Sequence, residues 1–390
     1  MSQILTNIEG ILKDKYQPAL SNLINVEPSP FMEMIRKEPL TNNTVRLAAP
    51  VGINGGFGFG AEGVNTPVAG EQRYFDFEVK AVDMYVDIRV SNKTVVLGSS
   101  NTSAMINALD AEVKGSYAAA KWNLSRALFG DGSGKLCNYV MEDGTTPSNL
   151  LKVDDVSRVI EGLTVDVMVN DQKVHQARIA FVDHLNKTVT LEGDPINPET
   201  CGTGFLVVQG SYNREITGLA KLMTEGGEIY GVSRVDNPLL NPMTVNVEGP
   251  LSDLILYRGI RAAAKQRGAK INLLMMGDDA FEKYQAYMDE HTTHLVEKHK
   301  FAGGATGYSI LVGDREVVIV NESMVPADEV WGVDTNSFVL QQTPWEFLSH
   351  QGSIFTLGAN SSIYRALLAS YGNLICENPG GCLRFKNCAQ

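Results

Sequence analysis

The residues near position 290 form the densest group of possible metal ligands in the sequence. His291, His294 and His299 lie close to Glu290 and Glu297. Two imidazoles three residues apart can lie on one face of a helix, which is a spacing that zinc sites use. The HExxH arrangement is absent and no fourth ligand is evident, so we interpret the group as a charged, solvated helix end, with metal binding as the alternative.

Two glycine-rich segments have the composition of phosphate-binding loops. The segment Gly58-Phe-Gly-Ala-Glu-Gly63 matches the dinucleotide-binding fingerprint, which requires a helix directly after it. Here Pro67 and an extended segment follow, so we predict a flexible loop. The segment Gly130-Asp-Gly-Ser-Gly134 lacks the Lys-Ser/Thr pair of a P-loop and is predicted to be a turn that ends a helix. No cofactor is expected.

The cysteines do not follow a zinc-binding or catalytic pattern. They are Cys137, Cys201, Cys376, Cys382 and Cys388. With no signal peptide, reduced thiols are expected, and metal binding or bonding between subunits by the last three is the alternative. No GxSxG motif and no recognisable Cys/His pairing occur. We therefore predict no catalytic, cofactor-binding or metal residues and do not expect an enzyme.

The composition is that of an acidic globular protein. The 390 residues are 44% hydrophobic and 20% charged, with a formal net charge of −12, and the length suggests two or three domains. An acidic surface repels nucleic acid and anionic membranes, although it is compatible with a shell that encloses DNA. No apolar run is long enough to predict a transmembrane helix.

The N-terminal quarter of the sequence has little material for a core of its own. A short helix is predicted over residues 3–16 and an amphipathic piece around Phe31. Residues 46–97 are predicted to form a long β-hairpin with a glycine-rich tip, and the alternation over residues 74–80 indicates its return strand. Because a hairpin this long cannot bury both faces within one subunit, we expect it to need a partner.

In the rest of the sequence the spacing of the apolar residues changes twice. Apolar residues at steps of three and four predict a helix that ends near Gly130. Alternation from about Val153 to Ser211 predicts a small inserted β-barrel or sandwich. Helices from Leu251 and Asp278, followed by further strands, predict an α+β body.

The order of these parts resembles the Hong Kong 97-type major capsid protein of tailed bacteriophages. Three segments carry the resemblance: Ile11-Leu-Lys-Asp-Lys-Tyr-Gln-Pro18 for its arm, Asp110-Ala-Glu-Val-Lys-Gly-Ser-Tyr117 through Leu128-Phe-Gly-Asp131 for its spine helix, and Gln209-Gly-Ser-Tyr-Asn-Arg-Glu-Ile-Thr-Gly-Leu219 for the re-entry after the insert. The resemblance implies an α+β fold of this capsid type with an inserted small β-barrel. It implies the following division: N-terminal arm 1–45, E-loop hairpin 46–98, P-domain spine helix and following strand 99–150, barrel or knob 151–212, A-domain mostly 213–345, and return to the P-domain with the C-terminal tail 346–390.

The resemblance also implies a function in assembly. Such a chain forms hexamers and pentamers of an icosahedral head around double-stranded DNA, without sequence specificity and without a membrane partner. Its other implied partners are a portal, a separate scaffolding protein and a decoration protein. The implied location is the virion, with the host cytoplasm during assembly. Some members cross-link through a lysine in the E-loop tip, but no lysine lies between Arg46 and Val79, so no such cross-link is expected.

Two alternatives stay open on the sequence alone. An encapsulin-like compartment shell shares the same fold. A soluble metal-dependent hydrolase using His291 and His294 belongs to a different class of protein.

Overall fold

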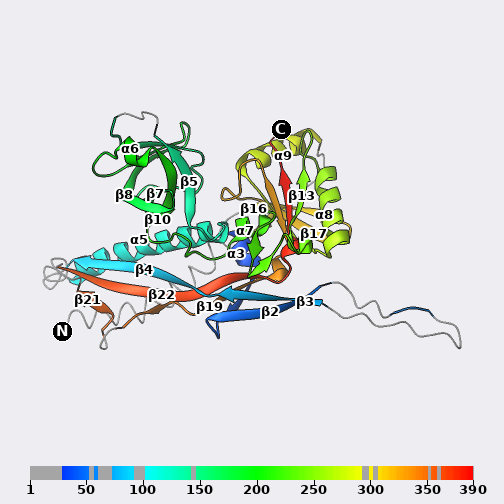
Figure 1. Ribbon diagram of the computed structural model, residues 1–390, viewed down its shortest axis with the longest axis horizontal. Coiled ribbons are helices and arrows are strands. Elements are labelled where there is room, and N and C mark those ends of the chain that lie inside the picture. The colour runs from blue at the N-terminus through cyan, green and yellow to red at the C-terminus, as the bar shows by residue number, and fades with distance from the viewer. Residues whose placement is uncertain are drawn as a thin grey trace.

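The computed structural model describes residues 29–51, 57–59, 73–91, 102–141, 146–291, 298–301, 306–349, 353–357 and 362–389. They form a long sheet with a helix along it, a closed barrel, an α/β lobe and a projecting hairpin (Figure 1). The barrel and the lobe stand on the same side of the long strands, which gives the chain a narrow base with two projections.

The long sheet is built on two strands from opposite ends of the chain. Strand β4 (Val82–Ser91) pairs antiparallel with β22 (Ile363–Cys376) over ten residues, from Val82 opposite Gly372 to Ser91 opposite Ile363. Four shorter strands complete the sheet: β1 (Arg36–Pro39), β19 (Phe338–Gln342), β20 (Glu346–Phe347) and β21 (Phe355–Leu357).

Helix α5 (Thr102–Leu128) lies along this sheet. Its 27 residues correspond to a length of about 40 Å. Val113, Leu124 and Leu128 are buried in the core that the helix shares with β4 and β22. The helix predicted to end near Gly130 is therefore confirmed.

The α/β lobe contains a seven-stranded mixed sheet. Its strands, in spatial order, are β13 (Met243–Asn246), β23 (Leu383–Lys386), β18 (Val330–Val333), β14 (Leu273–Met276), β17 (Arg315–Asn321), β16 (Thr306–Val312) and β15 (Lys298–Lys300). Along β14, Leu273 and Met275 face the core that is shared with the long sheet, whereas Leu274 and Met276 face the two lobe helices.

The two lobe helices cover the same face of this sheet. They are α8 (Asp253–Arg267) and α9 (Asp278–His291). Leu256 and Ile260 of α8 and Tyr284 of α9 belong to one buried cluster. Gly268, in the left-handed conformation with φ 64°, ends α8. Both predicted lobe helices are confirmed.

The barrel closes on itself through six antiparallel strands. They are β5 (Lys135–Val140), β6 (Leu150–Val153), β9 (Thr188–Leu191), β8 (Gln172–Asp183), β7 (Thr164–Val169) and β10 (Thr203–Val208). Alternating apolar residues such as Val165, Val167 and Ile179 fill the interior. The predicted barrel is present. Strand β5 also belongs to it, although it lies before the predicted start at residue 151, because it pairs with β10 far along the chain.

The remaining elements are short. They are the hairpin strands β2 (Thr44–Val51) and β3 (Arg73–Lys80), helices α3 (Pro30–Met34), α6 (Pro198–Cys201) and α7 (Leu219–Met223), strands β11 (Glu228–Ile229) and β12 (Val232–Ser233), and 3-10 turns η2 (Pro238–Leu240), η3 (Thr335–Ser337) and η4 (Pro379–Gly381). The helix predicted over residues 3–16 lies outside the described residues. Within the described part of the chain, no helix has the length and apolar character needed to cross a bilayer.

Candidate assembly surfaces

Strands β2 and β3 form a hairpin at the edge of the body, and residues 57–59 lie beyond the body (Figure 1). Strands β2 and β3 pair from Thr44 opposite Lys80 to Val51 opposite Arg73, as a separate two-stranded sheet. Side chains alternate along β3 between exposed and covered positions, as the sequence predicts. A two-stranded sheet is at best marginally stable in water, so its outer part requires contacts that this subunit does not supply among the described residues.

The base of the hairpin is held firmly to the body. Phe77 is fully buried, and its ring lies 5.6 Å from that of Tyr230, in an edge-on arrangement. The Asn373 side-chain amide donates to the carbonyl of Lys80 at 2.8 Å, and its oxygen accepts from the backbone N–H of Thr217 at 2.9 Å. The hairpin therefore leaves the body in a fixed direction.

Two aromatic side chains are exposed in the hairpin tip, which is the segment between β2 and β3. Phe57 and Phe59 are 83% and 97% exposed, and their rings lie 5.4 Å apart. They belong to the segment that matches the dinucleotide fingerprint, of which residues 57–59 are described and the rest lies outside the described residues. Large apolar side chains this exposed are typical of a surface that another molecule covers.

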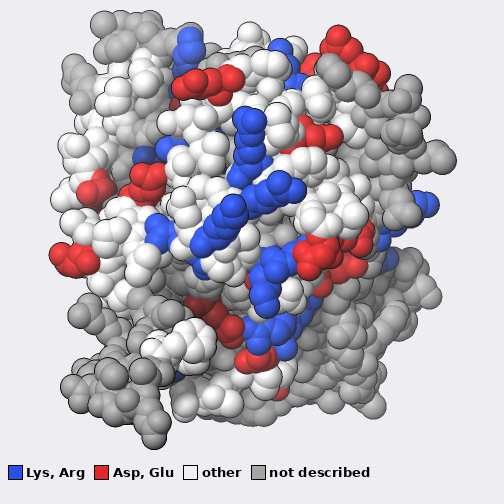
Figure 2. Space-filling view, turned by 90° about the vertical axis from the view of Figure 1, so that its right-hand side faces the viewer, with Lys and Arg blue, Asp and Glu red and all other residues white. Residues whose placement is uncertain are grey.

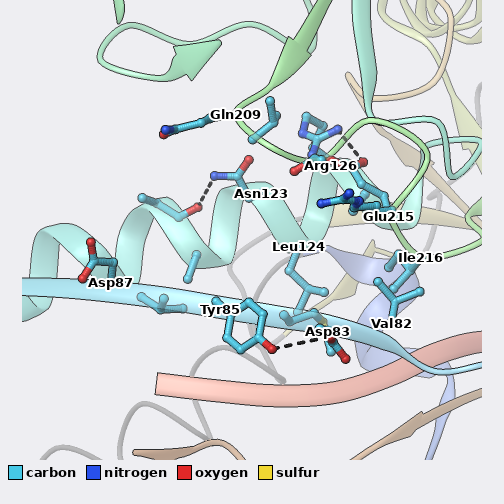
Figure 3. Close-up of a pocket in the computed structure, with 18 of the residues that line it drawn as sticks. Val82, Asp83, Tyr85, Asp87, Asn123, Leu124, Arg126, Gln209, Glu215 and Ile216 are labelled. Atoms are coloured by element: carbon cyan, nitrogen blue, oxygen red, sulfur yellow. Dashed lines mark hydrogen bonds and ion pairs between the residues drawn. The ribbon is translucent and has the colours of Figure 1, made fainter. Parts of the chain in front are cut away.

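A groove of about 400 Å³ lies between α5, β4 and the segment that returns from the barrel. Figure 3 shows Asn123 and Leu124 of α5 on one side and Val82, Asp83 and Tyr85 of β4 on the other. The Asn123 side-chain amide donates to Ala119 O at 2.9 Å, while its buried oxygen has no hydrogen-bond partner.

One end of the groove is closed by a buried ion pair between α5 and the returning segment (Figure 3). The guanidinium of Arg126 donates to both carboxylate oxygens of Glu215, at 3.0 and 2.5 Å. The two side chains are only 3% and 8% exposed. A pair with this geometry is bidentate, and it fixes the return segment to the helix.

A third charged side chain joins the barrel to both other parts of the body. The Arg158 guanidinium donates to Phe129 O at 3.1 Å, at the end of α5, and to Met324 O at 3.2 Å, in the lobe. Burial lowers the pKa of Arg158, and nearby carboxylates, Asp155 among them, oppose that shift. The barrel is therefore attached by specific polar contacts in addition to its two connecting segments.

The segment Gly130–Gly134 forms the neck of the barrel. Gly132 and Gly134 have φ of 89° and 76°, and a Cβ on Gly134 would lie 2.7 Å from the carbonyl oxygen of Ser211. The Asn213 N–H donates to Ser133 O at 2.9 Å, so the chain enters and leaves the barrel side by side. The predicted turn is confirmed, and the close approach of the two segments explains the glycines.

The long strands are joined by an exposed charged network. Arg365 of β22 and Arg89 of β4 both donate to the carboxylate of Asp87. Partial burial alone would raise the pKa of Asp87, but the hydrogen bonds and charges of these two guanidinium groups outweigh it and hold the pKa below its usual value.

The histidine group and the cysteines are not assembled into a described site. His294 and Glu297 lie outside the described residues, and among the described residues no three His, Cys, Asp or Glu side chains are arranged to hold a metal. All five cysteines are free and buried. Burial raises the pKa of Cys388 to about 12, with Asp328 and Glu329 adding to the shift, so its thiolate is strongly disfavoured.

The buried charges at the neck could not be picked out from the sequence. Arg126 stands in a helix rich in polar residues, and Glu215 lies 89 positions away. Arg126 lies two residues from Leu124 and two from Leu128, so the apolar periodicity places it on the side of the helix away from them and gives no signal of its burial.

Comparison with known proteins rests on structure. No family model matches the sequence, and no curated protein matches it. A chain of the cyanophage A-1(L) capsid asymmetric unit matches with a TM-score of 0.51 at 10% identity, covering 96% of this chain and 93% of that chain. An encapsulin complex from Synechococcus elongatus PCC 7942 matches with a TM-score of 0.45 at 9% identity, covering 93% and 89%. A structure of Mycobacterium phage Bobi matches with a TM-score of 0.43 at 10% identity, covering 92% of this chain and 90% of that chain.

The cyanophage match establishes the fold. It extends over nearly the full length of both chains, so the long sheet, the helix along it and the α/β lobe together are the fold of a phage capsid protein. The fold class expected from the resemblance is confirmed at this level, together with the closed six-stranded barrel.

Proposed function

We propose that this chain is the major capsid protein of a tailed bacteriophage, a structural subunit that assembles into the hexamers and pentamers of an icosahedral head. The observation that carries the proposal is the hairpin, which is fixed at its base and uncovered along its outer part in a chain with a capsid-protein fold. A neighbouring copy can supply the missing cover, which makes burial of the hairpin a consequence of assembly.

In this proposal the parts take the roles that the resemblance implies. The hairpin is the E-loop, α5 is the spine helix of the P-domain together with the long sheet, and the lobe is the A-domain that meets its copies around the ring axis. The barrel stands on one side of the long strands, beside the lobe (Figure 1), which suits a knob on one surface of a shell wall. Residues 1–45 are proposed as the N-terminal arm.

The proposed partners follow from the proposed shell. They are other copies of the chain, double-stranded DNA without sequence specificity, a portal, a scaffolding protein and a decoration protein. The proposed location is the virion, with assembly in the host cytoplasm. The proposed role is structural and involves no catalysis. Each contact between subunits can be weak, because closure of a shell multiplies the contacts that must break together.

Exposed aromatics at the hairpin tip provide the test. The variant Phe57→Ser with Phe59→Ser removes apolar surface that is exposed in the subunit, so its unfolding transition should match that of the wild type. Its assembly, followed by sedimentation velocity of the full chain with and without a scaffolding partner, should fall by about tenfold or more.

A matched control is Leu239→Ser, which changes another exposed apolar side chain, 52% exposed, far from the hairpin tip in the sequence. It should assemble like the wild type. Equal assembly by the tip variant and the wild type would contradict the proposed role of the hairpin. Wild-type chains that stay monomeric under all conditions would contradict the proposed function itself.

A further inference from the structure

Helix α8 carries a line of exposed cations on the face that points away from its sheet. Arg258, Arg261 and Lys265 are all exposed, and their spacing of three and four residues places them on one face. Leu254, 54% exposed, begins the same line. Figure 2 views the side of the molecule on which α8 lies in Figure 1, and Lys and Arg side chains cross the middle of that face.

These three cations have no partner within the described part of the subunit. None of the ion pairs there includes them. Other arginines in the body do pair with carboxylates: Arg36, Arg89, Arg126, Arg365 and Arg384. Like charges in one line on a helix repel each other, so this face is destabilising until an anionic surface covers it.

The neighbouring helix α9 carries the opposite charge. Its exposed side chains include Asp279, Glu282, Asp289 and Glu290 with a single cation, Lys283, among them, and no ion pair among the described residues uses these five. The helices are in contact, since the Tyr284 hydroxyl of α9 donates to Asp253 of α8 at 2.8 Å. Even so, the two charged faces do not pair with each other. One subunit therefore presents a cationic face and an anionic face side by side.

We infer that the cationic face of α8 in one copy docks on the anionic face of α9 in the next copy around a ring. The inference rests on the proposed function, and it assigns one contact that orders the lobes around the axis. In this contact α8 of each copy lies on α9 of the next copy, so the contact repeats head-to-tail until the ring closes. Leu254 adds an apolar contact at one end of the cationic line.

The acidic character of the chain favours this occupant over nucleic acid, because a net negative charge repels a polyanion. The chain has a formal net charge of −12, so a docking partner made of the same chain is anionic on average, and α9 concentrates that charge beside the cationic face. Contacts between exposed charges are screened by salt. Ring formation should therefore weaken as the ionic strength rises from about 0.05 to about 0.5 M.

Charge reversal with compensation tests the contact in the full chain. The triple variant Arg258→Glu, Arg261→Glu, Lys265→Glu should lower the assembled fraction by more than about tenfold, measured by sedimentation velocity and electron microscopy. Its matched control, Arg258→Lys, Arg261→Lys, Lys265→Arg, keeps every charge and should assemble like the wild type.

Reversal of the opposing face should restore assembly. Adding Glu282→Lys, Asp289→Lys and Glu290→Lys to the triple variant recreates attraction with the signs exchanged, so the assembled fraction should return to within about threefold of the wild type. The α9 variant alone should fail to assemble, and mixing it with the α8 variant should restore six-membered rings of alternating copies, because a ring of five cannot alternate. This mixing result does not depend on either variant assembling alone, provided that both show the wild-type thermal transition.

Other outcomes overturn the inference. Normal assembly of the α8 variant would show that the face is not a contact between copies. Folded variants that stay apart after compensation and after mixing would exclude α9 as the opposing face. Normal shells with reduced DNA content would assign the cationic face to nucleic acid. In each of these cases the wild type assembles and the proposed function stands, whereas a wild type that never assembles contradicts both.

Discussion

Removal of one partner of the buried Arg126–Glu215 pair should destabilise the neck of the barrel strongly. In the variant Arg126→Met, the Glu215 carboxylate loses both of its hydrogen bonds, at 3.0 and 2.5 Å, while its side chain stays only 8% exposed. An unpaired buried charge of this kind costs about 3–5 kcal/mol of unfolding free energy. Part of that cost should disappear at low pH, where the carboxylate can take up a proton.

Replacing both partners should be much less harmful than replacing one. In the double variant Arg126→Met, Glu215→Leu, no charge remains buried, and a well-packed apolar pair can be neutral to within about 1–2 kcal/mol. The free energy of unfolding should be measured by denaturant titration of unassembled subunits, together with limited proteolysis of residues 209–218. The double-mutant cycle then gives the coupling energy.

A loss of unfolding free energy below about 1 kcal/mol in Arg126→Met would contradict this prediction. Destabilisation of the double variant by the sum of the two single changes would contradict it as well. Either result would mean that water reaches the pair and that the return segment is held by other contacts.

Three further predictions concern other parts of the body. Burial raises the pKa of Glu322 from 4.5 to about 7, with a smaller contribution from Asp278. The fold therefore favours the neutral carboxyl group, and the free energy of unfolding falls as pH rises from 4.5 through about 7. Glu322→Gln should thus be more stable than the wild type by about 2–3 kcal/mol at pH 8 and about equal below pH 4.5, in denaturant titrations at both pH values. A Cβ on Gly218 would lie 2.5 Å from three carbonyl oxygens at the end of α5. The variant Gly218→Ala should therefore lower the thermal midpoint by about 4 °C or more in calorimetry. The control Gly226→Ala should lower it less, because open space surrounds Gly226, although its φ is 72°. All five cysteines are buried, so a thiol reagent should modify them only after denaturant is added, and fast labelling of the native chain would contradict this packing.

The parts with a strong local period were predictable from the sequence. Helix α8 has a regular apolar face and a terminal Gly268, and β3 alternates strictly. In both cases the spacing of the apolar residues indicates which side faces the core and which side faces solvent. The order of such parts was enough to indicate a capsid-type fold, which the cyanophage comparison bears out.

The parts that depend on distant pairing were not predictable. Strand β5 joins the barrel by pairing with β10, about 65 residues later. Arg126 meets Glu215, and Asn373 reaches the carbonyl of Lys80, across even longer separations. Such contacts follow from topology, and a single sequence records neither the partner nor the burial of these polar residues.

The charged faces of α8 and α9 are visible in the sequence but not interpretable there. Four basic residues in α8 and five acidic residues in α9 read as ordinary solvated helices. The structure adds that the helices lie on the same face of one sheet and that their exposed charges do not pair with each other among the described residues. This arrangement makes the two charged faces a candidate contact between copies.

Electron cryo-microscopy of particles formed by the full chain tests the central claim most directly. The account predicts closed shells in which the hairpin of each subunit lies across a neighbouring copy and the lobes meet around five-fold and six-fold axes. A uniform monomer or dimer, with or without a scaffolding partner, would contradict the account, as would shells in which the hairpin folds back on its own subunit.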